Sequence, residues 1–453
     1  MNKANLETDN ICAISTPQGI GGVALLRVSG NKAIEIVQSI FSKEINNASG
    51  YSIHYGSIFE NKNEIDQVLV TIFRNPHSFT GEDTAEITCH GSIFIQHKII
   101  ELLITNGARI AKAGEFSQRA FLNGKMDLSQ TEAIADLIHS SSAAAHKIAI
   151  NQMKGGFSDE LKSLREKLIS FASLVELELD FAEEDVEFAD RKQLNELVKK
   201  LVSHVNQLKN SFKYGNAIKN GVETVIVGRP NAGKSTLLNG LLNEDRALVS
   251  NIPGTTRDTI EEIININGIE FRLIDTAGIR NTTDNIEKMG VERTMEKIST
   301  SSILVYLYDV KKTKKEEVKK DIEKINQNEI PTLIIANKID LLKSENNMPK
   351  NHIKLSAKKG KDVQILKKEI HQLFLEQKDD EHGVVISNLR HFEALEMASK
   401  ELQKVKQGLE NNLSGDFLAM DIRQVLYHIG SITGDISSDE LLGNIFTNFC
   451  IGK

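Results

Sequence analysis

A glycine-rich segment at residues 228–235, GRPNAGKS, has the residue types and spacing that bind nucleotide phosphates. It follows the apolar run TVIV and precedes the helix-like sequence TLLNGLL, a context that argues against a turn without a ligand. Gly228 and Gly233 allow the backbone to wrap around phosphates, so that its N–H groups and the next helix start face the anion. We expect Lys234 to reach the β- and γ-phosphates and Ser235 to bind Mg²⁺. The nucleotide contacts expected in this loop are Asn231, Ala232, Gly233, Lys234, Ser235 and Thr236.

Two further segments have the residue types, and the order along the chain, of the motifs that contact the γ-phosphate in GTPases. DTAG at 275–278 ends an apolar run, which would place Asp275 near Mg²⁺ and the Gly278 N–H near the γ-phosphate. TTRD at 255–258 lies between the loop and DTAG, and it predicts a first switch with Thr256 as a Mg²⁺ ligand. The contacts expected here are Ser250, Asn251, Ile252, Pro253, Gly254, Thr255, Thr256, Asp275, Thr276, Ala277 and Gly278.

NKID at 337–340 and SAK at 356–358 predict that the bound base is guanine. Asp340 can accept two N–H···O hydrogen bonds from the edge of guanine, while Asn337 is expected to contact the base. Adenine lacks that donor pair and would leave a desolvated carboxylate unpaired, at a cost of about 1–3 kcal/mol or more. SAK then supplies a backbone contact. The residues expected at the base are Asn337, Lys338, Asp340, Ser356, Ala357 and Lys358.

Hydrolysis needs a group that these motifs do not supply. The residue after DTAG is Ile279, where Ras-like GTPases place a Gln that orients the attacking water. Asn231 offers an amide oxygen, and carbonyls around Ser250 and Ile252 could complete a site for K⁺, whose charge would replace an arginine finger. Glu287 could position the water. Taken alone, Asn231 is as readily a turn residue, and Glu287 is more readily a solvated residue on a helix face.

The elements that position these residues can be predicted from the apolar pattern. Between 216 and 375, five short β-branched runs followed by loop residues indicate the buried parallel strands of an α/β sheet. They are TVIVG (224–228), FRLIDTAG (271–278), ILVYLYDV (303–310), TLIIANKID (332–340) and HIKLSA (352–357). Amphipathic helices are predicted from Leu128 to about Phe212 and from about Ser387 onward, where proline is absent. In the mixed first 120 residues, ICAISTP and VALLRVSG suggest strands, whereas NKAIEIVQSIF and IFIQHKIIELLITNGAR suggest helices.

These elements predict a multidomain α/β protein. We expect an α+β N-terminal domain at 1–120, a helical domain in two parts at 121–215 and 377–453, and an inserted P-loop α/β domain at 216–376.

Composition narrows the class of protein. The chain has 453 residues, with 55 Lys and Arg against 62 Asp and Glu, so its net charge of −7 argues against coating nucleic acid by bulk charge. Its three cysteines have no metal-ligand spacing and fit a reducing cytosol. No signal peptide and no apolar run of membrane-spanning length is present, which favours a cytoplasmic location.

Together, GRPNAGKS, GTTRD, DTAGIR, NIEKMGVER and the terminal FCIGK resemble the bacterial tRNA-modification GTPases called MnmE or TrmE. GGVALLRVSG, SFTGEDTAE and ISSDELLGNIFTNFCIGK extend the resemblance over the full length. It implies a homodimer that dimerises through a folate-binding N-terminal domain similar to aminomethyltransferases. It also implies a partner, MnmG, which binds FAD and forms a heterotetramer with it. Together they would add a 5-(carboxymethyl)aminomethyl-type group to the wobble uridine of certain tRNAs, using a one-carbon unit from 5-formyl- or methylene-tetrahydrofolate.

The resemblance also implies roles for individual residues. Glu287 would orient water, and Cys450 would be catalytic. Taken alone, Cys450 is more readily a small buried hydrophobic residue, and Arg27 and Glu86 are more readily ordinary surface charges. The K⁺ site would fall on Asn231, Ser250, Ile252 and Thr255, Mg²⁺ on Ser235 and Thr256, and folate on Arg27, Glu86, Lys125 and Lys453.

Two other functions remain as alternatives. A ribosome-assembly GTPase that acts as an RNA-binding switch would carry a KH-like domain with a GxxG loop after the nucleotide domain, but residues 376–453 contain no GxxG. A folate aminomethyltransferase with a degenerate nucleotide site conflicts with the intact GRPNAGKS, DTAG and NKID. The lysine-rich KKTKKEEVKK (311–320) is interpreted as a solvated helix face rather than a nucleic-acid patch.

Overall fold

The structure is a computed structural model in which the chain forms two compact units. The first comprises Met1–Ile138, Gln152–Ile169 and Leu426–Lys453, and the second comprises His139–Asn151 and Ser170–Val425. The described residues are 9–180, 191–243, 261–275, 295–342, 351–377, 384–411, 413–447, 449–450 and 452.

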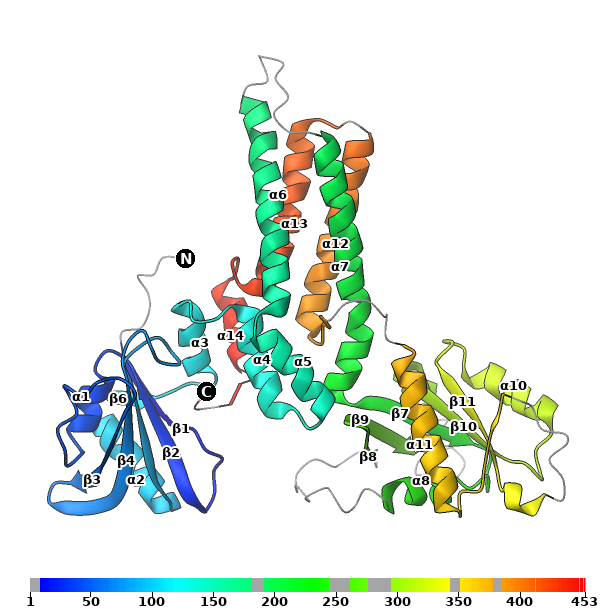
Figure 1. Ribbon diagram of the computed structural model, residues 1–453, viewed down its shortest axis with the longest axis horizontal. Coiled ribbons are helices and arrows are strands. Elements are labelled where there is room, and N and C mark those ends of the chain that lie inside the picture. Colours follow the sequence, from blue (N-terminus) through cyan, green and yellow to red (C-terminus); the bar gives the residue numbers. More distant parts are fainter. Residues whose placement is uncertain are drawn as a thin grey trace, which may run out of the picture. The chain divides into compact units, whose positions relative to one another are not determined.

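The first unit is built on a six-stranded sheet with the order β3-β4-β5-β2-β1-β6 (Figure 1). Its elements are β1 (Asn10–Ile14), β2 (Gly21–Ser29), α1 (Ala33–Gln38), β3 (Ser52–Glu60), β4 (Asn63–Phe73), β5 (Thr84–Gly91), α2 (Ile93–Thr105) and β6 (Ala108–Ile110). Neighbouring strands are antiparallel except β1 and β6. On β4, Val68, Val70 and Ile72 are buried in alternation, and they share a core with Ile99 and Leu103 of α2. The predictions of β1, β2 and α2 are confirmed, and α1 is shorter than its predicted segment.

The last residues of the chain pack within this first unit. Here α3 (Glu115–Leu122) and α4 (Leu128–His139) follow the sheet, and α14 (Asp439–Thr447) precedes the C-terminus. Leu442 and Phe446 of α14 form a small apolar cluster with Leu128. The Gly114 N–H donates to the Cys450 carbonyl over 3.4 Å.

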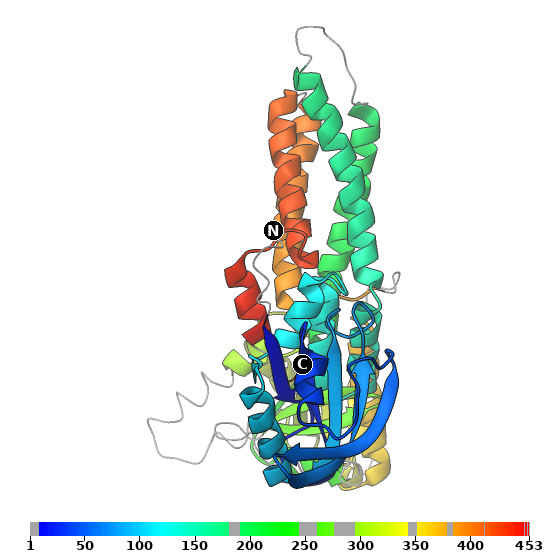
Figure 2. The same cartoon turned by 90° about the vertical axis from the view of Figure 1, so that its left-hand side faces the viewer.

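Long helices form the first part of the second unit, as the proline-free sequence predicts. Apart from the helices of its α/β sheet and the last residue of α4, the helices that lie wholly or partly in it are α5 (Ala143–Met153), α6 (Gly156–Asp180), α7 (Arg191–Asn220), α12 (Leu389–Glu410) and α13 (Gly415–Thr433). The long helices α7 and α12 lie side by side, as the labels of Figure 1 show, and Figure 2 shows the same helical part turned by 90°. Their contact includes Phe212 stacked on Phe392 with ring centroids 4.5 Å apart, and the Ser399 hydroxyl donating to Asn206 Oδ1.

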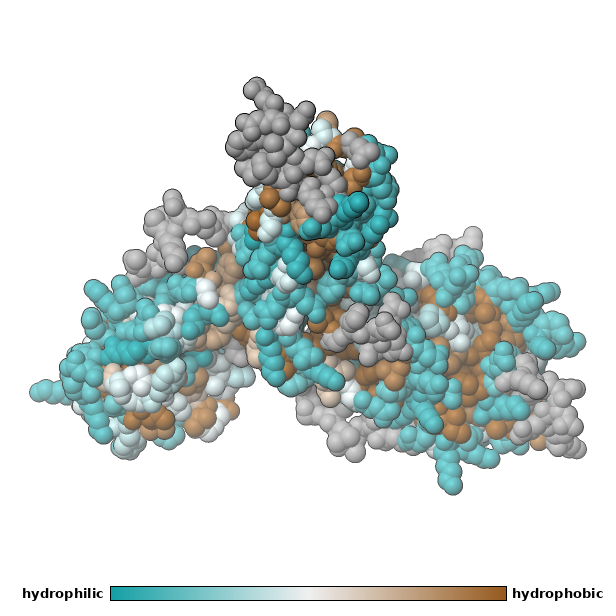
Figure 3. Space-filling model, turned by 45° about the horizontal axis from the view of Figure 1, so that its top comes forward, coloured by the Kyte–Doolittle hydropathy of each residue, from teal (hydrophilic) through white to brown (hydrophobic). Residues whose placement is uncertain are grey.

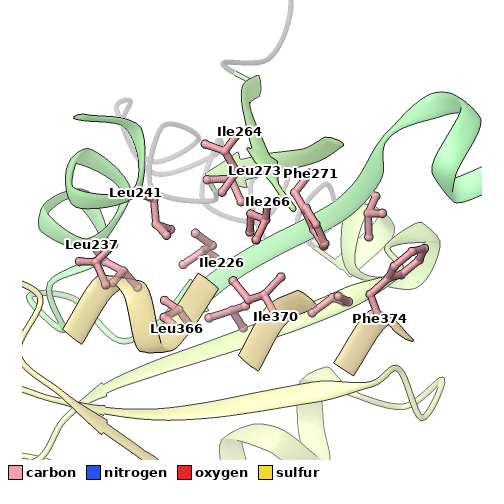
Figure 4. Packing of buried hydrophobic residues seen from close by; sticks show 14 of the residues in the cluster. Ile226, Leu237, Leu241, Ile264, Ile266, Phe271, Leu273, Leu366, Ile370 and Phe374 are labelled. Atoms are coloured by element: carbon pink, nitrogen blue, oxygen red, sulfur yellow. The ribbon is translucent and has the colours of Figure 1, made fainter. Parts of the chain in front are cut away.

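The second unit also contains a six-stranded α/β sheet with the order β12-β11-β10-β7-β9-β8. Its elements are β7 (Val222–Gly228), α8 (Lys234–Asn243), β8 (Glu261–Ile266), β9 (Ile269–Asp275), β10 (Ile303–Asp309), α10 (Lys315–Ile325), β11 (Thr332–Asn337), the 3₁₀ turn η4 (Ile339–Leu341), β12 (Ile353–Leu355) and α11 (Gly360–Leu375). All pairs are parallel except β8 and β9. Figure 4 shows a core between this sheet, α8 and α11, with Ile226, Leu237 and Leu366 among its residues. The five predicted runs all form strands.

The predicted domain boundaries stay a prediction; those after residues 120 and 215 fall inside α3 and α7. Figure 3 shows hydrophilic side chains over much of the described surface in that view, with hydrophobic ones between them. Among the described helices, none has the length and apolarity needed to cross a membrane.

Candidate nucleotide and one-carbon sites

The loop GRPNAGKS joins β7 to α8, the place that its sequence predicts. Asn231 and Gly233 have φ values of 60° and 101°, in the left-handed region that Asn tolerates and Gly favours. Gly228 packs so closely on β10 that a Cβ would lie 2.1 Å from the Leu307 carbonyl oxygen. The loop conformation therefore requires glycine at residues 228 and 233.

The Lys234 ammonium lies within the same loop. Its Nζ donates to the carbonyl oxygens of Gly228, over 2.7 Å, and Arg229, over 3.3 Å. Since an ammonium has three donors, it can exchange these contacts for phosphate oxygens without leaving the loop. Lys234 is therefore positioned for the contact that the sequence predicts.

The buried Asn337 side chain ties three nucleotide motifs together. Its Nδ2 donates to the Ala232 carbonyl over 2.7 Å. Its Oδ1 accepts the backbone N–H of Lys338, over 2.8 Å, and of Ala357, over 2.9 Å. One amide thus links the phosphate loop, the NKID turn and the SAK loop, although the sequence predicts only a contact to the base.

A second link joins the phosphate loop to the NKID turn through Lys338. Its Nζ donates to the Asn231 carbonyl over 2.7 Å and to Asp309 Oδ2 over 2.8 Å. Burial raises the pKa of Asp309, but hydrogen bonds from Lys338 and the Lys311 N–H outweigh that effect and bring it below 3.8. Asp309 is therefore an anionic anchor for this turn. No sequence motif predicts a role for Asp309, which lies one residue before the end of the predicted strand run 303–310.

The Asp340 carboxylate is exposed at the end of the NKID motif. A hydrogen bond from the Ser356 side chain lowers the pKa of Asp340, helped by the charge of Lys358. Ser356 is itself fixed, because its N–H donates to Asp362 Oδ2 over 2.7 Å. Asp340 is thus an oriented acceptor, as recognition of the guanine edge requires.

The residues predicted to bind cations lie in both described and undescribed parts of the chain. Asn231 and Ser235 carry amide and hydroxyl oxygens, the donor types that K⁺ and Mg²⁺ take. The β7–β9 register pairs Asp275 with Ile226, two residues before Gly228, so the backbone of Asp275 lies beside the start of the loop. Among the described residues, no group of three or more His, Cys, Asp or Glu could hold a metal. The predicted residues outside the described ranges are Ser250, Asn251, Ile252, Pro253, Gly254, Thr255, Thr256, Thr276, Ala277, Gly278, Glu287 and Lys453.

In the first unit, the sheet brings Arg27 and Glu86 together. They are register partners on β2 and β5, and Arg27 Nε and NH2 each lie 2.8 Å from Glu86 Oε1. The guanidinium also lies 5.3 Å from the centroid of the Phe79 ring and 5.6 Å from that of Phe116. This combination of an ion pair and aromatic faces suits a planar polar ligand with an anionic tail.

Lys125 contacts the loop that carries Phe79. Its Nζ donates to the Pro76 carbonyl over 2.8 Å, and its side chain passes Gly81. Three of the four residues implied for folate, Arg27, Glu86 and Lys125, therefore contact either each other or this loop.

The same loop is held by a partly buried ion-pair network that no sequence motif predicts. Glu82 accepts the Ser29 hydroxyl over 2.7 Å and pairs with Arg119 NH1 at 3.2 Å. Arg119, whose side chain is 5% exposed, also pairs with Asp9 and Glu115. The segment SFTGEDTAE, which contains Glu82, is one of those that resemble the family. It does not indicate the ion pairs of Glu82, because the partner residues are distant in sequence.

The C-terminus reaches the sheet that carries Arg27 and Glu86. The Ser15 hydroxyl donates to the Gly452 carbonyl over 3.1 Å, and the Ser15 N–H donates to Leu25 on β2 over 2.7 Å. The Cys450 side chain is exposed, in contrast to the buried environment considered as one alternative. The end of the chain is thus part of the first unit.

Comparisons with known proteins match nearly the whole chain. A family model described as MnmE helical domain matches residues 128–450, and one described as GTP-binding protein TrmE N-terminus matches residues 10–125. A protein named tRNA modification GTPase MnmE from Cytophaga hutchinsonii is 50% identical over 452 residues, which cover 98% of this chain and 98% of that protein. Proteins of the same name from Flavobacterium johnsoniae and Bacteroides thetaiotaomicron are 50% and 48% identical, over 99% of this chain and 100% of each relative.

Proposed function

This chain belongs to the MnmE family of tRNA modification GTPases, and on that premise we propose that it hydrolyses GTP in a K⁺-stimulated reaction. With MnmG, it would install the 5-(carboxymethyl)aminomethyl-type group on the wobble uridine of certain tRNAs. The one-carbon unit would come from 5-formyl- or methylene-tetrahydrofolate. The chain would act in the cytoplasm as a homodimer within a heterotetramer, with FAD bound by the partner.

The observation that carries this proposal is the Asn337 side chain, which joins the phosphate loop to both base-binding loops. Because these loops are fixed to one buried amide, phosphate and base contacts can form together. Asp340 would accept the N–H groups of guanine, and Lys234 would bind the β- and γ-phosphates.

The cations would supply positive charge at the transferring phosphate. Ser235 and Thr256 would hold Mg²⁺. Glu287 would orient the attacking water in place of the missing glutamine at Ile279. Donors to K⁺ would be Asn231, Ser250, Ile252 and Thr255.

In the first unit, Arg27, Glu86, Lys125 and Lys453 would hold the folate. Arg27 offers a cation between two aromatic rings, which supports binding of a flat, anionic molecule. Cys450 would take part in the chemistry as a thiolate, and its exposure leaves the sulfur accessible.

The GTPase is tested by measuring turnover of GTP and ATP in KCl and in NaCl at matched ionic strength. We expect hydrolysis of GTP and not ATP, with K⁺ faster by roughly 10³-fold, the scale of an arginine-finger charge. Equal turnover in the two salts would exclude the K⁺ site, and equal use of ATP would exclude the guanine site.

The one-carbon site is tested by deleting Ile451–Lys453. We expect 5-formyl-tetrahydrofolate to bind about 10–150-fold more weakly, because a charge-assisted contact is lost, while GTP turnover is retained. Unchanged folate affinity would remove Lys453 from the site.

A further inference from the structure

The turn that joins β8 to β9 lies against the start of α5, a contact within the second unit (Figure 1). Asn267 and Gly268 form this two-residue turn with φ values of 52° and 83°, and Ile266 pairs with Ile269 beside it. The Gly268 carbonyl accepts the Ala144 N–H over 3.0 Å. The tip of the hairpin thus satisfies a free N–H in the first turn of α5.

Side chains extend the contact on both sides of this hydrogen bond. Ala145 is buried in the apolar cluster that includes Ile266 and Phe271, and Ile148 packs against that cluster. The Ser141 hydroxyl, just before α5, donates to a Glu270 carboxylate oxygen.

The fit is close at the turn. A Cβ on Gly268 would lie 3.2 Å from the Ala143 Cβ, so a side chain there would press on α5. The Ser142 hydroxyl caps the helix by accepting the Ala145 N–H over 3.2 Å. The hairpin and the helix start therefore form one packed interface.

The position of this hairpin in the sequence gives the interface its significance. β8 begins at Glu261, three residues after the GTTRD motif ends, and β9 ends at Asp275, the first residue of DTAG. The hairpin therefore connects the two segments whose sequences match γ-phosphate sensors. Its tip is the end farthest along each strand from those segments.

The helix on the other side of the interface belongs to a different part of the chain. Residues 139–151, which include most of α5, pack in the unit that holds the nucleotide loop, whereas residues up to 138 and from 152 to 169 belong to the first unit. We propose that the contact between the β8–β9 tip and α5 is the interface through which the nucleotide state reaches the helical part of the chain. This inference rests on the proposed GTPase. It adds the residues that couple hydrolysis to the rest of the protein.

Linkage makes the inference measurable in the full-length chain. If the nucleotide state changes the stability of the contact, amide exchange in α5 must change with the nucleotide, because opening is needed for exchange. Hydrogen–deuterium exchange is measured without nucleotide, with GDP and with a non-hydrolysable GTP analogue. We expect the amides of residues 143–151, among them Ala144, to differ at least about 5-fold between the GDP and GTP-analogue states.

The phosphate loop serves as the internal reference in the same experiment. If both nucleotides protect residues 228–235 while α5 exchanges equally in both states, the inference is overturned and the GTPase proposal stands. If neither nucleotide protects residues 228–235, both are overturned.

Variants test the contact directly. Gly268→Val should abolish the nucleotide dependence of α5 exchange and lower wobble-uridine modification by about 10-fold or more, with GTP turnover kept within about 3-fold. Ser141→Ala, which leaves the turn intact, should have the same effects to a smaller degree. Asn267→Gly is the matched control, because glycine keeps its left-handed φ and the turn residue in contact with α5 is unchanged. Normal coupling in both Gly268→Val and Ser141→Ala would overturn the inference.

Discussion

The backbone of Gly233 lies so close to Asn337 that a Cβ at residue 233 would be 2.3 Å from the Asn337 amide nitrogen. That nitrogen is the donor to the Ala232 carbonyl. The hydrogen bond of Asn337 therefore requires glycine at residue 233, although the two residues are more than a hundred positions apart in sequence. A change at either position should affect both phosphate and base binding.

Gly233→Ala should weaken GTP binding by about 100-fold or more, because the φ of 101° is strained for alanine and the new methyl displaces the Asn337 amide. Isothermal titration with GDP and GTP measures the loss. Gly107→Ala is the matched control, since Gly107 has a φ of 107° but no atom within 4 Å of a Cβ. Equal nucleotide affinity in the two variants would contradict the Gly233–Asn337 relationship.

Asp340→Asn should change the base specificity of the site from guanine to xanthine. The amide of Asn presents a donor to the guanine N–H groups, so GTP affinity should fall by about 10-fold or more. Xanthine has a carbonyl where guanine has an amino group, so xanthosine triphosphate should then bind better than GTP. Competition binding measures the ratio, and an unchanged preference for GTP would remove Asp340 from the base site.

The Glu115 carboxylate should make the first unit sensitive to acid. Burial raises the pKa of Glu115, but hydrogen bonds from Arg109, the Lys112 N–H and Arg119 outweigh burial and bring it below 4.5. Because the folded-state pKa is lowered, its stabilising effect is present above about pH 4.5 and is lost as pH falls through the folded-state pKa.

Glu115→Gln should therefore lower the free energy of unfolding of this unit by about 1–3 kcal/mol at neutral pH. The difference from the unsubstituted chain should shrink below pH 4.5. Hydrogen exchange of the α3 amides in urea, measured over a pH series, follows the effect. A difference that grows on acidification would have the wrong sign for this carboxylate.

The three cysteines should differ in reactivity. Burial raises the pKa of Cys12 and of Cys89 to about 11, whereas Cys450 is exposed. At pH 8 roughly one in a thousand molecules would carry a thiolate at either buried site. A maleimide should label one site quickly in the folded chain and none in Cys450→Ser. Two rapidly labelled sites would contradict the burial of Cys12 or Cys89.

Much of the nucleotide site was predictable because its chemistry is local in sequence. Short β-branched runs followed by loop motifs correctly predict β7, β9, β10, β11 and β12. The antiparallel edge strand β8, with the sequence EEIINI, was missed because charged and amide residues interrupt its apolar pattern. In the first unit, β3 and β4 were missed because their faces do not separate polar from apolar residues: Ile53, Tyr55 and Leu69 are exposed, whereas Asp66 is buried.

The supporting contacts were not predictable because they depend on tertiary packing. Arg27 pairs with Glu86 only because of the register of β2 and β5. Arg119 forms ion pairs with Asp9 and Glu82, which lie in segments distant from it in sequence. A side chain's polar partners cannot be read from spacing when they lie on different elements. The same holds for the Asn337 amide, whose motif is recognisable but whose three bonds are not.

Mass spectrometry of wobble uridines tests the central claim most directly. The tRNA is taken from a strain lacking this protein and from the same strain supplied with the unsubstituted chain or with Lys234→Ala, in which the phosphate-binding ammonium is removed. The account predicts that the 5-(carboxymethyl)aminomethyl-type modification is lost without the protein, restored by the unsubstituted chain and not restored by Lys234→Ala. Normal modification in the strain lacking the protein would contradict it.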